Sequence, residues 1–299
     1  MACLGTWELV SAVSNAGGLG IIGSGGAPPQ WLRAQLLQTR KHTTNPFGVN
    51  IMLMSPFLNE SLDILIEQKV QVVTFGGGNP GRHVKRLKEA GLKIIPVVSS
   101  VALARRLERS GVDAIIAEGM ESGGHVGDTS TLALVPQVVD SVKIPVIAAG
   151  GIADARGMVA AFALGAQGIQ MGTRFICTPE CIAHYNFKQM IINAADRATT
   201  ITGITTGHPV RCLENKLTRA FEVLEKSGAS IEEMDEFGRG RLTQGVIQGD
   251  VVEGSLMAGQ ISGLIKDIRP VKQVIENAVK EAEVLMADLY RIVKKYVLE

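Results

Sequence analysis

The chain has 299 residues, with 30 basic and 29 acidic side chains and a formal net charge of +1. This balance argues against a nucleic-acid coat protein or a polybasic membrane binder, both of which concentrate positive charge. Hydrophobic residues make up 46% of the chain, enough for a large packed core, so the length fits one large α/β barrel or two ordinary domains.

Short apolar runs recur through the first 175 residues, and most of them start 21 to 31 residues apart. Continuous Val/Ile runs with little polar alternation are typical of parallel strands that are buried on both faces. We therefore predict seven strands, at residues 19–23, 47–53, 70–76, 93–98, 114–119, 145–150 and 168–175.

Helical patterns fill the gaps between these strands. Three of the predicted helices stop at a glycine, which favours a helix C-terminus. The helices are expected at residues 7–15, 59–69, 82–90, 102–109 and 155–164. Strands that alternate with helices in this way predict a (β/α)8 TIM barrel.

Seven strands are one fewer than a closed barrel needs, because the chain opens on the helix at residues 7–15. Either the barrel is open or its first strand precedes Met1, and we favour the missing strand. The strand rhythm stops after Phe175, so residues 177–265 are expected to form an inserted substrate or lid domain, here called the inserted segment. Residues 1–176 and 266–299 would then form the barrel, with an amphipathic helix at 271–296 closing its exterior.

The chain has no apolar run of the roughly 18 residues that span a bilayer, and its N-terminus lacks the pattern of a signal peptide. Four cysteines do not make a disulfide framework, and a metal cluster would need more ligands. We expect free thiols in a reducing, cytoplasmic compartment and no metal site. The cysteines are Cys3, Cys177, Cys181 and Cys212.

Residues 18–23 match the pattern G-x-G-x-x-G, but they follow a helix and contain a strand, the reverse of the dinucleotide motif. We interpret them as a tight turn. The glycines at strand ends are better evidence, because barrels bind ligands at the C-terminal ends of their strands. Residues 149–152 and 170–173 follow the last two strands, where barrels often bind phosphate through backbone N–H groups.

The loop Ser122–His125 follows the strand at 114–119 and holds the one histidine at a recognisable strand end. His125 could donate or accept a proton near neutral pH, or it could be a surface residue that only hydrogen-bonds the loop. The other histidines form no metal pattern, and a structural role is favoured for His208 in the inserted segment. Asn50, inside a strand, belongs either to a buried polar network or to a ligand site.

Several of these segments together resemble one family. Residues 16–22, 46–51, 117–125, 145–152, 170–175 and 254–260 are similar to the nitronate monooxygenase/2-nitropropane dioxygenase superfamily. Within it they most resemble the FMN-dependent enoyl-[acyl-carrier-protein] reductases II of bacterial fatty-acid synthesis, over nearly the whole chain. Family members carry a first strand that ends in Gly-Gly-Met-Ala, and this chain starts at Met1-Ala2, as if inside that motif.

The resemblance implies an FMN-binding TIM barrel with a domain inserted after the eighth strand. His125 would be the catalytic histidine. Gly150, Gly151, Gly172 and Thr173 would hold the FMN phosphate. The full set of implied cofactor contacts is Asn50, Glu118, Ser122, Gly123, Gly150, Gly151, Gln170, Met171, Gly172 and Thr173.

The implied reaction is reduction of a trans-2-enoyl thioester of acyl-carrier protein by NADH or NADPH, the last step of the elongation cycle. The flavin would pass hydride to the β-carbon, and His125 would protonate the α-carbon or polarise the thioester carbonyl. An activating cation and a homodimer are further expectations from the resemblance. An acidic carrier protein would need a basic docking surface, for which six residues are candidates, although a merely solvated face is the alternative: Arg174, Lys188, Arg197, Arg211, Lys216 and Arg219.

Three other functions remain open. The first is oxidation of alkyl nitronates by O2 on the same scaffold, although nitronate-oxidising relatives often have Gln where this chain has Glu118. The second is a sugar-phosphate lyase or isomerase without a flavin. The third is a barrel that binds a small molecule without turning it over.

Overall fold

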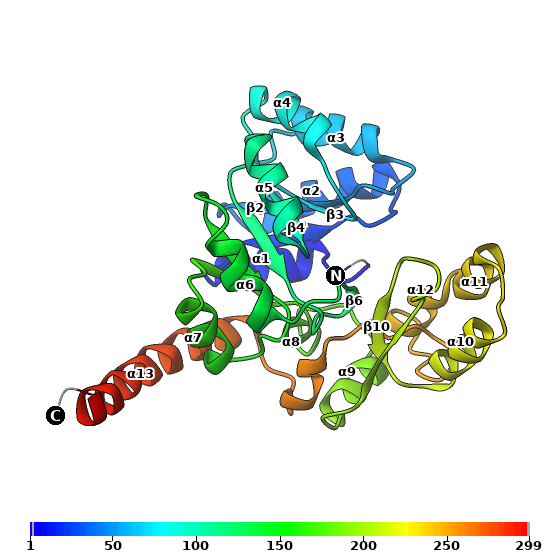
Figure 1. Cartoon of the computed structure of the whole chain (residues 1–299). Coiled ribbons are helices and arrows are strands. Elements are labelled where there is room, and N and C mark those ends of the chain that lie inside the picture. The colour runs from blue at the N-terminus through cyan, green and yellow to red at the C-terminus, as the bar shows by residue number, and fades with distance from the viewer. Residues whose placement is uncertain (2, 298–299) are drawn as a thin grey trace.

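The main sheet contains seven strands that are parallel throughout and lie in the order β1-β2-β3-β4-β5-β7-β8 (Figure 1). It is seen in a computed structural model that describes residues 1 and 3–297. The strands are β1 (Gly20–Gly23), β2 (Phe47–Met52), β3 (Val72–Gly76), β4 (Lys93–Val98), β5 (Ile115–Glu118), β7 (Val146–Ala149) and β8 (Gly168–Gln170).

Helices alternate with these strands. They are α1 (Trp7–Asn15), α2 (Pro29–His42), α3 (Leu58–Glu67), α4 (Gly81–Glu89), α5 (Val101–Arg109), α6 (Thr131–Val139), α7 (Ala155–Ala163) and α8 (Thr173–Ile176). The sequence patterns missed α2 and α6, and each of these helices contains a proline. Pro29 occupies the first position of α2, where its fixed φ favours the helix, and Pro136 lies inside α6, where proline normally argues against one.

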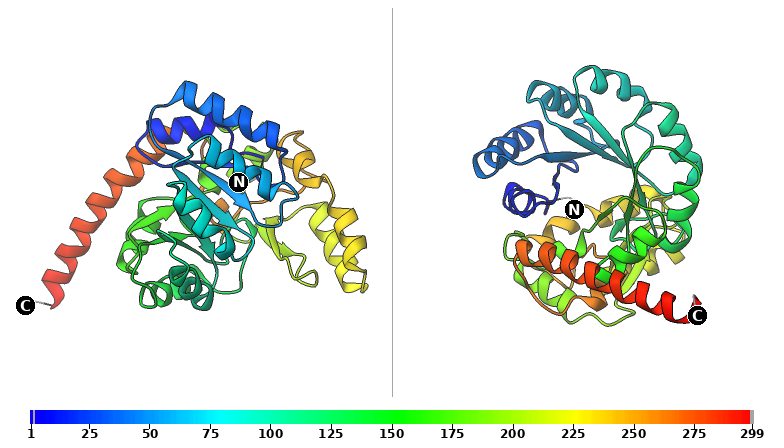
Figure 2. Two further views of the ribbon diagram at one scale, coloured as in Figure 1. Left: turned by 90° about the horizontal axis from the view of Figure 1, so that it is seen from above. Right: turned by 90° about the vertical axis from the view of Figure 1, so that its left-hand side faces the viewer.

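The sheet curls, and the helices surround it in a TIM-barrel-like α/β fold (Figure 2). Among the described residues, β1 and β8 are edge strands that do not pair with each other, which agrees with the predicted count of seven. The first residues bridge from one edge to the other. The N–H of Gly23 donates to the carbonyl of Gly5 at 2.9 Å, and a Cβ on Gly172 would lie 3.6 Å from the Met1 side chain.

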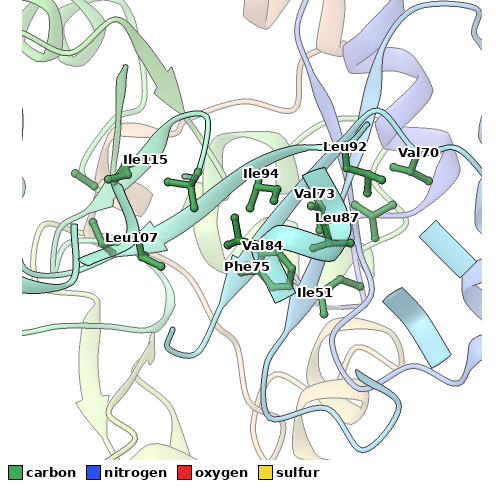
Figure 3. Packing of buried hydrophobic residues seen from close by; sticks show 14 of the residues in the cluster. Ile51, Val70, Val73, Phe75, Val84, Leu87, Leu92, Ile94, Leu107 and Ile115 are labelled. Carbon is green, nitrogen blue, oxygen red and sulfur yellow. The ribbon is translucent and has the colours of Figure 1, made fainter. Parts of the chain in front are cut away.

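The core lies between the sheet and the helices outside it (Figure 3). Val73, Phe75 and Ile94 from the strands are fully buried together with Leu87 from α4 and Leu107 from α5. Burying each such side chain stabilises the fold by about 1.5–3 kcal/mol. This packing makes the sheet a rigid support for the loops at its strand ends.

The last strand is shorter than predicted. The pattern indicated a strand over 168–175, but β8 ends at Gln170 and α8 begins at Thr173. Gln170 is the last residue with a partner, Ala149 of β7. Because no ladder continues beyond that pair, the apolar residues that follow form a helical turn instead.

The inserted segment contains strands that the sequence did not predict. It holds α9 (Tyr185–Ile192), β9 (Thr199–Thr202), β10 (Val210–Leu213), α10 (Lys216–Lys226), α11 (Ile231–Gly238), α12 (Arg241–Val246) and the 3-10 helix η1 (Gln260–Leu264). The short strand β10 pairs antiparallel with β9 on one side and with β6 (Gly124–His125) on the other. The loop after β5 is therefore paired to the inserted segment.

The C-terminal helix α13 (Val271–Val297) closes the exterior only in part. Its first half packs on α7 and α1, with Val274, Ala278 and Ala282 buried. Its second half projects from the body (Figure 1), so the prediction that the whole helix closes the barrel was wrong. The row of apolar side chains on α13 continues beyond the part of the helix that packs on the barrel.

Other sequence expectations agree with the structure. All four cysteines are free thiols. Residues 18–23 form the turn after α1 and the strand β1, as interpreted. No helix in the described part of the chain is long and apolar enough to cross a membrane.

Candidate active site

The parallel ladder brings three strand ends to one edge of the sheet. Glu118 is level with Ala149, and Ala149 is level with Gln170, so the loops after β5, β7 and β8 are neighbours. These loops hold Gly123, Gly150, Gly151, Met171, Gly172 and Thr173. The predicted cofactor residues of this half of the sheet therefore lie together.

Asn50 lies on β2, towards the same end of the sheet. Its side-chain Nδ2 donates to the hydroxyl of Thr74 at 2.9 Å. Its main-chain carbonyl accepts from the hydroxyl of Ser24 at 2.6 Å. The side chain is half-buried. The polar network considered from the sequence is thus present, and the accessible part of the amide stays a candidate ligand contact.

The turn after β7 has the backbone shape of an anion cradle. Gly150 and Gly151 both have positive φ, +88° and +73°. A Cβ on Gly150 would lie 2.7 Å from the carbonyl oxygen of Gly119, so a larger residue does not fit there. Among the described residues, the N–H groups of Gly151 and Gly172 make no hydrogen bond, which leaves them available to a phosphate.

Glu118 is a carboxyl group whose surroundings favour its neutral form. Burial raises the pKa of Glu118 to about 7, against the opposing influence of the Met1 ammonium and the nearby Ser122 hydroxyl. At neutral pH the group is therefore divided between the acid, which can donate a hydrogen bond, and the carboxylate, which cannot.

Ser122 carries a buried hydroxyl that lacks a hydrogen bond of normal geometry. The residue is 8% exposed, and its Oγ interacts with the Glu118 carboxyl only closely enough to lower the pKa of that group. The next residue, Gly123, packs so closely on Ala258 that a Cβ there would lie 2.6 Å from the Ala258 backbone. Native proteins rarely leave a buried hydroxyl unsatisfied, so this atom fits a bound group better than an empty site.

Replacing Ser122 by alanine should separate stability from cofactor binding. Since the variant loses an unsatisfied hydroxyl, we expect the flavin-free protein to be unchanged or up to about 1 kcal/mol more stable, while FMN binds about ten-fold more weakly. Ser262→Ala is the matched control, because its buried hydroxyl is already bonded to Gly259 O at 2.8 Å. That variant should lose stability and keep FMN affinity. Denaturation and flavin titration measure both, and equal FMN affinity in Ser122→Ala and wild type would contradict the assignment.

His125 lies on β6 and is exposed to solvent. Desolvation by surrounding protein atoms, and then the charge of His208, lower the pKa of His125. The two rings meet edge to face with their centroids 6.5 Å apart. The imidazole is therefore neutral at pH 7. His208, for which the sequence favoured a structural role, lies beside it, a proximity that only the pairing of β6 with β10 creates.

The sequence patterns also missed Glu121, which fixes the loop after β5. Its carboxylate accepts from the N–H of Thr131 at 2.9 Å and from the Thr131 hydroxyl at 2.8 Å, at the first turn of α6. The sequence signal that could have identified Glu121 is an acidic residue inside a glycine-rich loop. Because Glu121 directly precedes Ser122, its hydrogen bonds to Thr131 also fix the position of the Ser122 hydroxyl.

Three of the six residues predicted to form a basic docking surface are buried, so the prediction was wrong for them. Arg174, Lys188 and Arg211 are buried, each 8% exposed or less. Arg174 pairs with Asp267 at 3.0 Å, and the Lys188 ammonium donates to the carbonyls of Thr178 and Cys181. The exposed members are Arg197, Lys216 and Arg219. Counting charges along the chain could not reveal these internal partners.

No group of three or more His, Cys, Asp or Glu side chains in the described residues could hold a metal ion. Cys177, Cys181 and Cys212 are buried, and burial raises the pKa of Cys177 to about 12. Such a thiol is not a nucleophile at neutral pH. The candidate residues at this edge of the sheet are thus Glu118, Ser122, His125 and the glycine turns.

The chain is similar to proteins of known sequence and structure. The sequence model of the family described as nitronate monooxygenase matches residues 1–63 and 57–281. A solved structure of FabK from Thermotoga maritima is similar with a TM-score of 0.96 and 50% identity, covering 98% of this chain and 93% of that one.

Two curated relatives carry different names. A probable nitronate monooxygenase from Staphylococcus saprophyticus is 32% identical over 96% of this chain and 94% of its own length. A (3aS,4S,5R,7aS)-5-hydroxy-7a-methyl-1-oxo-octahydro-1H-indene-4-carboxyl-CoA dehydrogenase from Rhodococcus jostii is 31% identical over 92% of this chain and 88% of its own length.

Proposed function

Since the chain belongs to the nitronate monooxygenase family, we propose that it is an FMN-dependent oxidoreductase that reduces the trans-2-enoyl thioester of acyl-carrier protein with NADH or NADPH. The observation that carries this proposal is the similarity to FabK, at 50% identity over almost the whole chain. The Rhodococcus relative, whose name includes a CoA thioester, supports a thioester as the substrate class.

The residues present fit FMN, the cofactor of this family. The N–H groups of Gly151 and Gly172, with Gly150 and Thr173, would hold its phosphate. Ser122 Oγ would gain a hydrogen bond of normal geometry, as would the accessible part of Asn50. Glu118, Gly123, Gln170 and Met171 complete the proposed contacts around the same edge of the sheet. When bound, FMN supplies hydride transfer from a nicotinamide to the β-carbon of the enoyl thioester.

The protein's own contribution at the substrate is assigned to His125. A neutral imidazole can donate its N–H to the thioester carbonyl, or give a proton to the α-carbon. The lowered pKa of His125 favours hydrogen-bond donation to the carbonyl, since the cationic acid is scarce at pH 7. The exposed position of His125 suits a group that meets a substrate arriving from solvent.

Nitronate oxidation is the second candidate function, because the family name and the Staphylococcus relative both point to it. Steady-state assays separate the two. We expect NADH or NADPH consumption that depends on a crotonyl or longer enoyl thioester under anaerobic conditions. Oxygen uptake with an alkyl nitronate and no nicotinamide would favour the alternative. The same assay, with candidate cations added, tests for an activating cation.

We further assign residues 1–176 and 266–299 to the barrel and residues 177–265 to the inserted domain. Acyl-carrier protein is the proposed partner and the cytoplasm the proposed location, where both the carrier and the nicotinamide are found. Arg197, Lys216 and Arg219 are the basic residues left to contact the carrier. Lys216 and Arg219 already pair with Glu253 and Glu214, so they would have to exchange partners.

We propose that the protein is a homodimer joined through the projecting half of α13. Exposed apolar side chains repeat there at seven-residue spacing, as in a two-stranded coiled coil. The two rows are Val279, Met286 and Val293, and Leu289 and Tyr296. Polar residues such as Asp288 and Arg291 fill the opposite side.

Light scattering tests this interface. We expect twice the chain mass for wild type and the mass of one chain for Leu289→Glu, because a charge in the seam cannot be buried. Arg291→Ala, on the polar side, should leave the dimer intact. A wild-type monomer, or a Leu289→Glu dimer, would contradict the proposal.

A further inference from the structure

Two side chains anchor the loop that carries Ser122 and His125, and they do so from opposite sides. Glu121 holds it to the barrel through the first turn of α6. Arg211, on β10 of the inserted segment, holds it from the other side, where its Nε donates to the carbonyl of Met120 at 3.0 Å. The loop is thus fixed at two consecutive residues.

Arg211 is an unusual residue for a merely structural contact. It is 3% exposed, and its second bond runs from Nη1 to the hydroxyl of Thr199 at 3.0 Å. Among the described residues it forms no salt bridge, and burial lowers the pKa of Arg211, against the opposing charge of Glu121. Burying a guanidinium against neutral partners carries a desolvation cost that an apolar side chain at the same place would not.

The backbone of Arg211 adds to this anchor. In the antiparallel register, Arg211 is level with Gly124, and Val210 is level with His125. The N–H of Val126 donates to the carbonyl of Pro209 at 3.1 Å. The only strand partner of β6 in the described chain is β10. The place of His125 is therefore set by the inserted segment and not by the barrel sheet.

We propose that Arg211 is a positioning residue for His125. Its planar fork joins the Met120 carbonyl to the Thr199 hydroxyl and so fixes the loop at 120–125 relative to β9 and β10. A lysine keeps the charge but cannot supply two donors in this fixed geometry. The inference rests on the proposed function, in which His125 contacts the substrate. It adds that the inserted segment sets the catalytic geometry through one buried side chain.

The experiment compares Arg211→Met and Arg211→Lys with wild type as FMN-loaded proteins. Hydrogen–deuterium exchange of peptides that cover residues 119–126 reports the position of the loop. We expect faster exchange there in both variants, with unchanged exchange in β2 to β4. We also expect kcat for the enoyl thioester to fall about 10- to 100-fold, with the KM for the nicotinamide unchanged, because displacing His125 leaves cofactor reduction intact.

Thr199→Val is the milder variant, since it removes one acceptor and keeps the guanidinium. We expect the same local change in exchange and a fall in kcat of about three- to ten-fold. Arg239→Met, at an exposed residue of the inserted segment with no proposed role, is the control and should match wild type. Unchanged exchange over 119–126, or a Lys variant that behaves as wild type, would overturn the proposal. The exchange measurement needs no turnover, so it stands apart from a failure of the proposed function itself.

Discussion

Replacing His125 by alanine should reduce enoyl-thioester turnover by about 10²- to 10⁴-fold while FMN content stays normal. The reason is geometric. His125 lies on the exposed strand β6, whereas the glycines proposed to hold the phosphate follow β7 and β8, so its loss removes a proton or hydrogen-bond donor and no proposed cofactor contact. Steady-state assays with flavin content measured on the same samples check both parts.

Two further variants test how His125 acts and whether the effect is specific to it. His125→Gln keeps an N–H donor but cannot transfer a proton, so it should retain at least about ten-fold more activity than His125→Ala if the residue polarises the carbonyl. His83→Ala, on the outer helix α4, controls for the loss of a histidine. Turnover unchanged in His125→Ala would remove the residue from the mechanism.

Replacing Glu118 by glutamine should make the flavin-free protein more stable at neutral and alkaline pH but not in acid. Glu118 has a folded pKa of about 7, against an ordinary value of 4.5, so the folded state binds the proton more tightly than the unfolded chain. The contribution of Glu118 to the free energy of unfolding of wild type therefore falls as pH rises from 4.5 to 7, by about 2–3 kcal/mol, and then levels off.

Chemical denaturation between pH 4 and pH 9 measures this difference directly. The curves for wild type and Glu118→Gln should converge below pH 4.5 and separate to their full extent above pH 7. Glu60→Gln, an exposed carboxyl on α3, should follow wild type throughout. A constant offset at all pH values would mean that Glu118 does not titrate in this window.

The barrel strands were predictable because they are buried on both faces. The run at 93–98 is β4 as observed, and the run at 47–53 exceeds β2 by one residue. Unbroken apolar runs of this kind have few alternatives. By contrast, β9 is a run of threonines and isoleucine, and β6 is two residues long, so neither carries a pattern without its partner.

The candidate site shows the same division. Glycines at strand ends indicated which turns lie together at the proposed phosphate site, since parallel strands bring their ends together whatever the details of packing. The positions of Arg211 and Lys188 could not be predicted, because their partners are carbonyls and hydroxyls from other segments. The contact of Arg211 with Met120 joins residues 91 apart, and only the inserted segment's path creates it.

The visible spectrum of the purified protein under anaerobic conditions tests the central claim most directly. We expect a bound flavin that NADH or NADPH bleaches and whose colour an enoyl thioester restores without oxygen. A flavin bleached by an alkyl nitronate alone and restored only by oxygen would contradict enoyl reduction. A protein that stays colourless and takes up no added FMN would contradict the site itself.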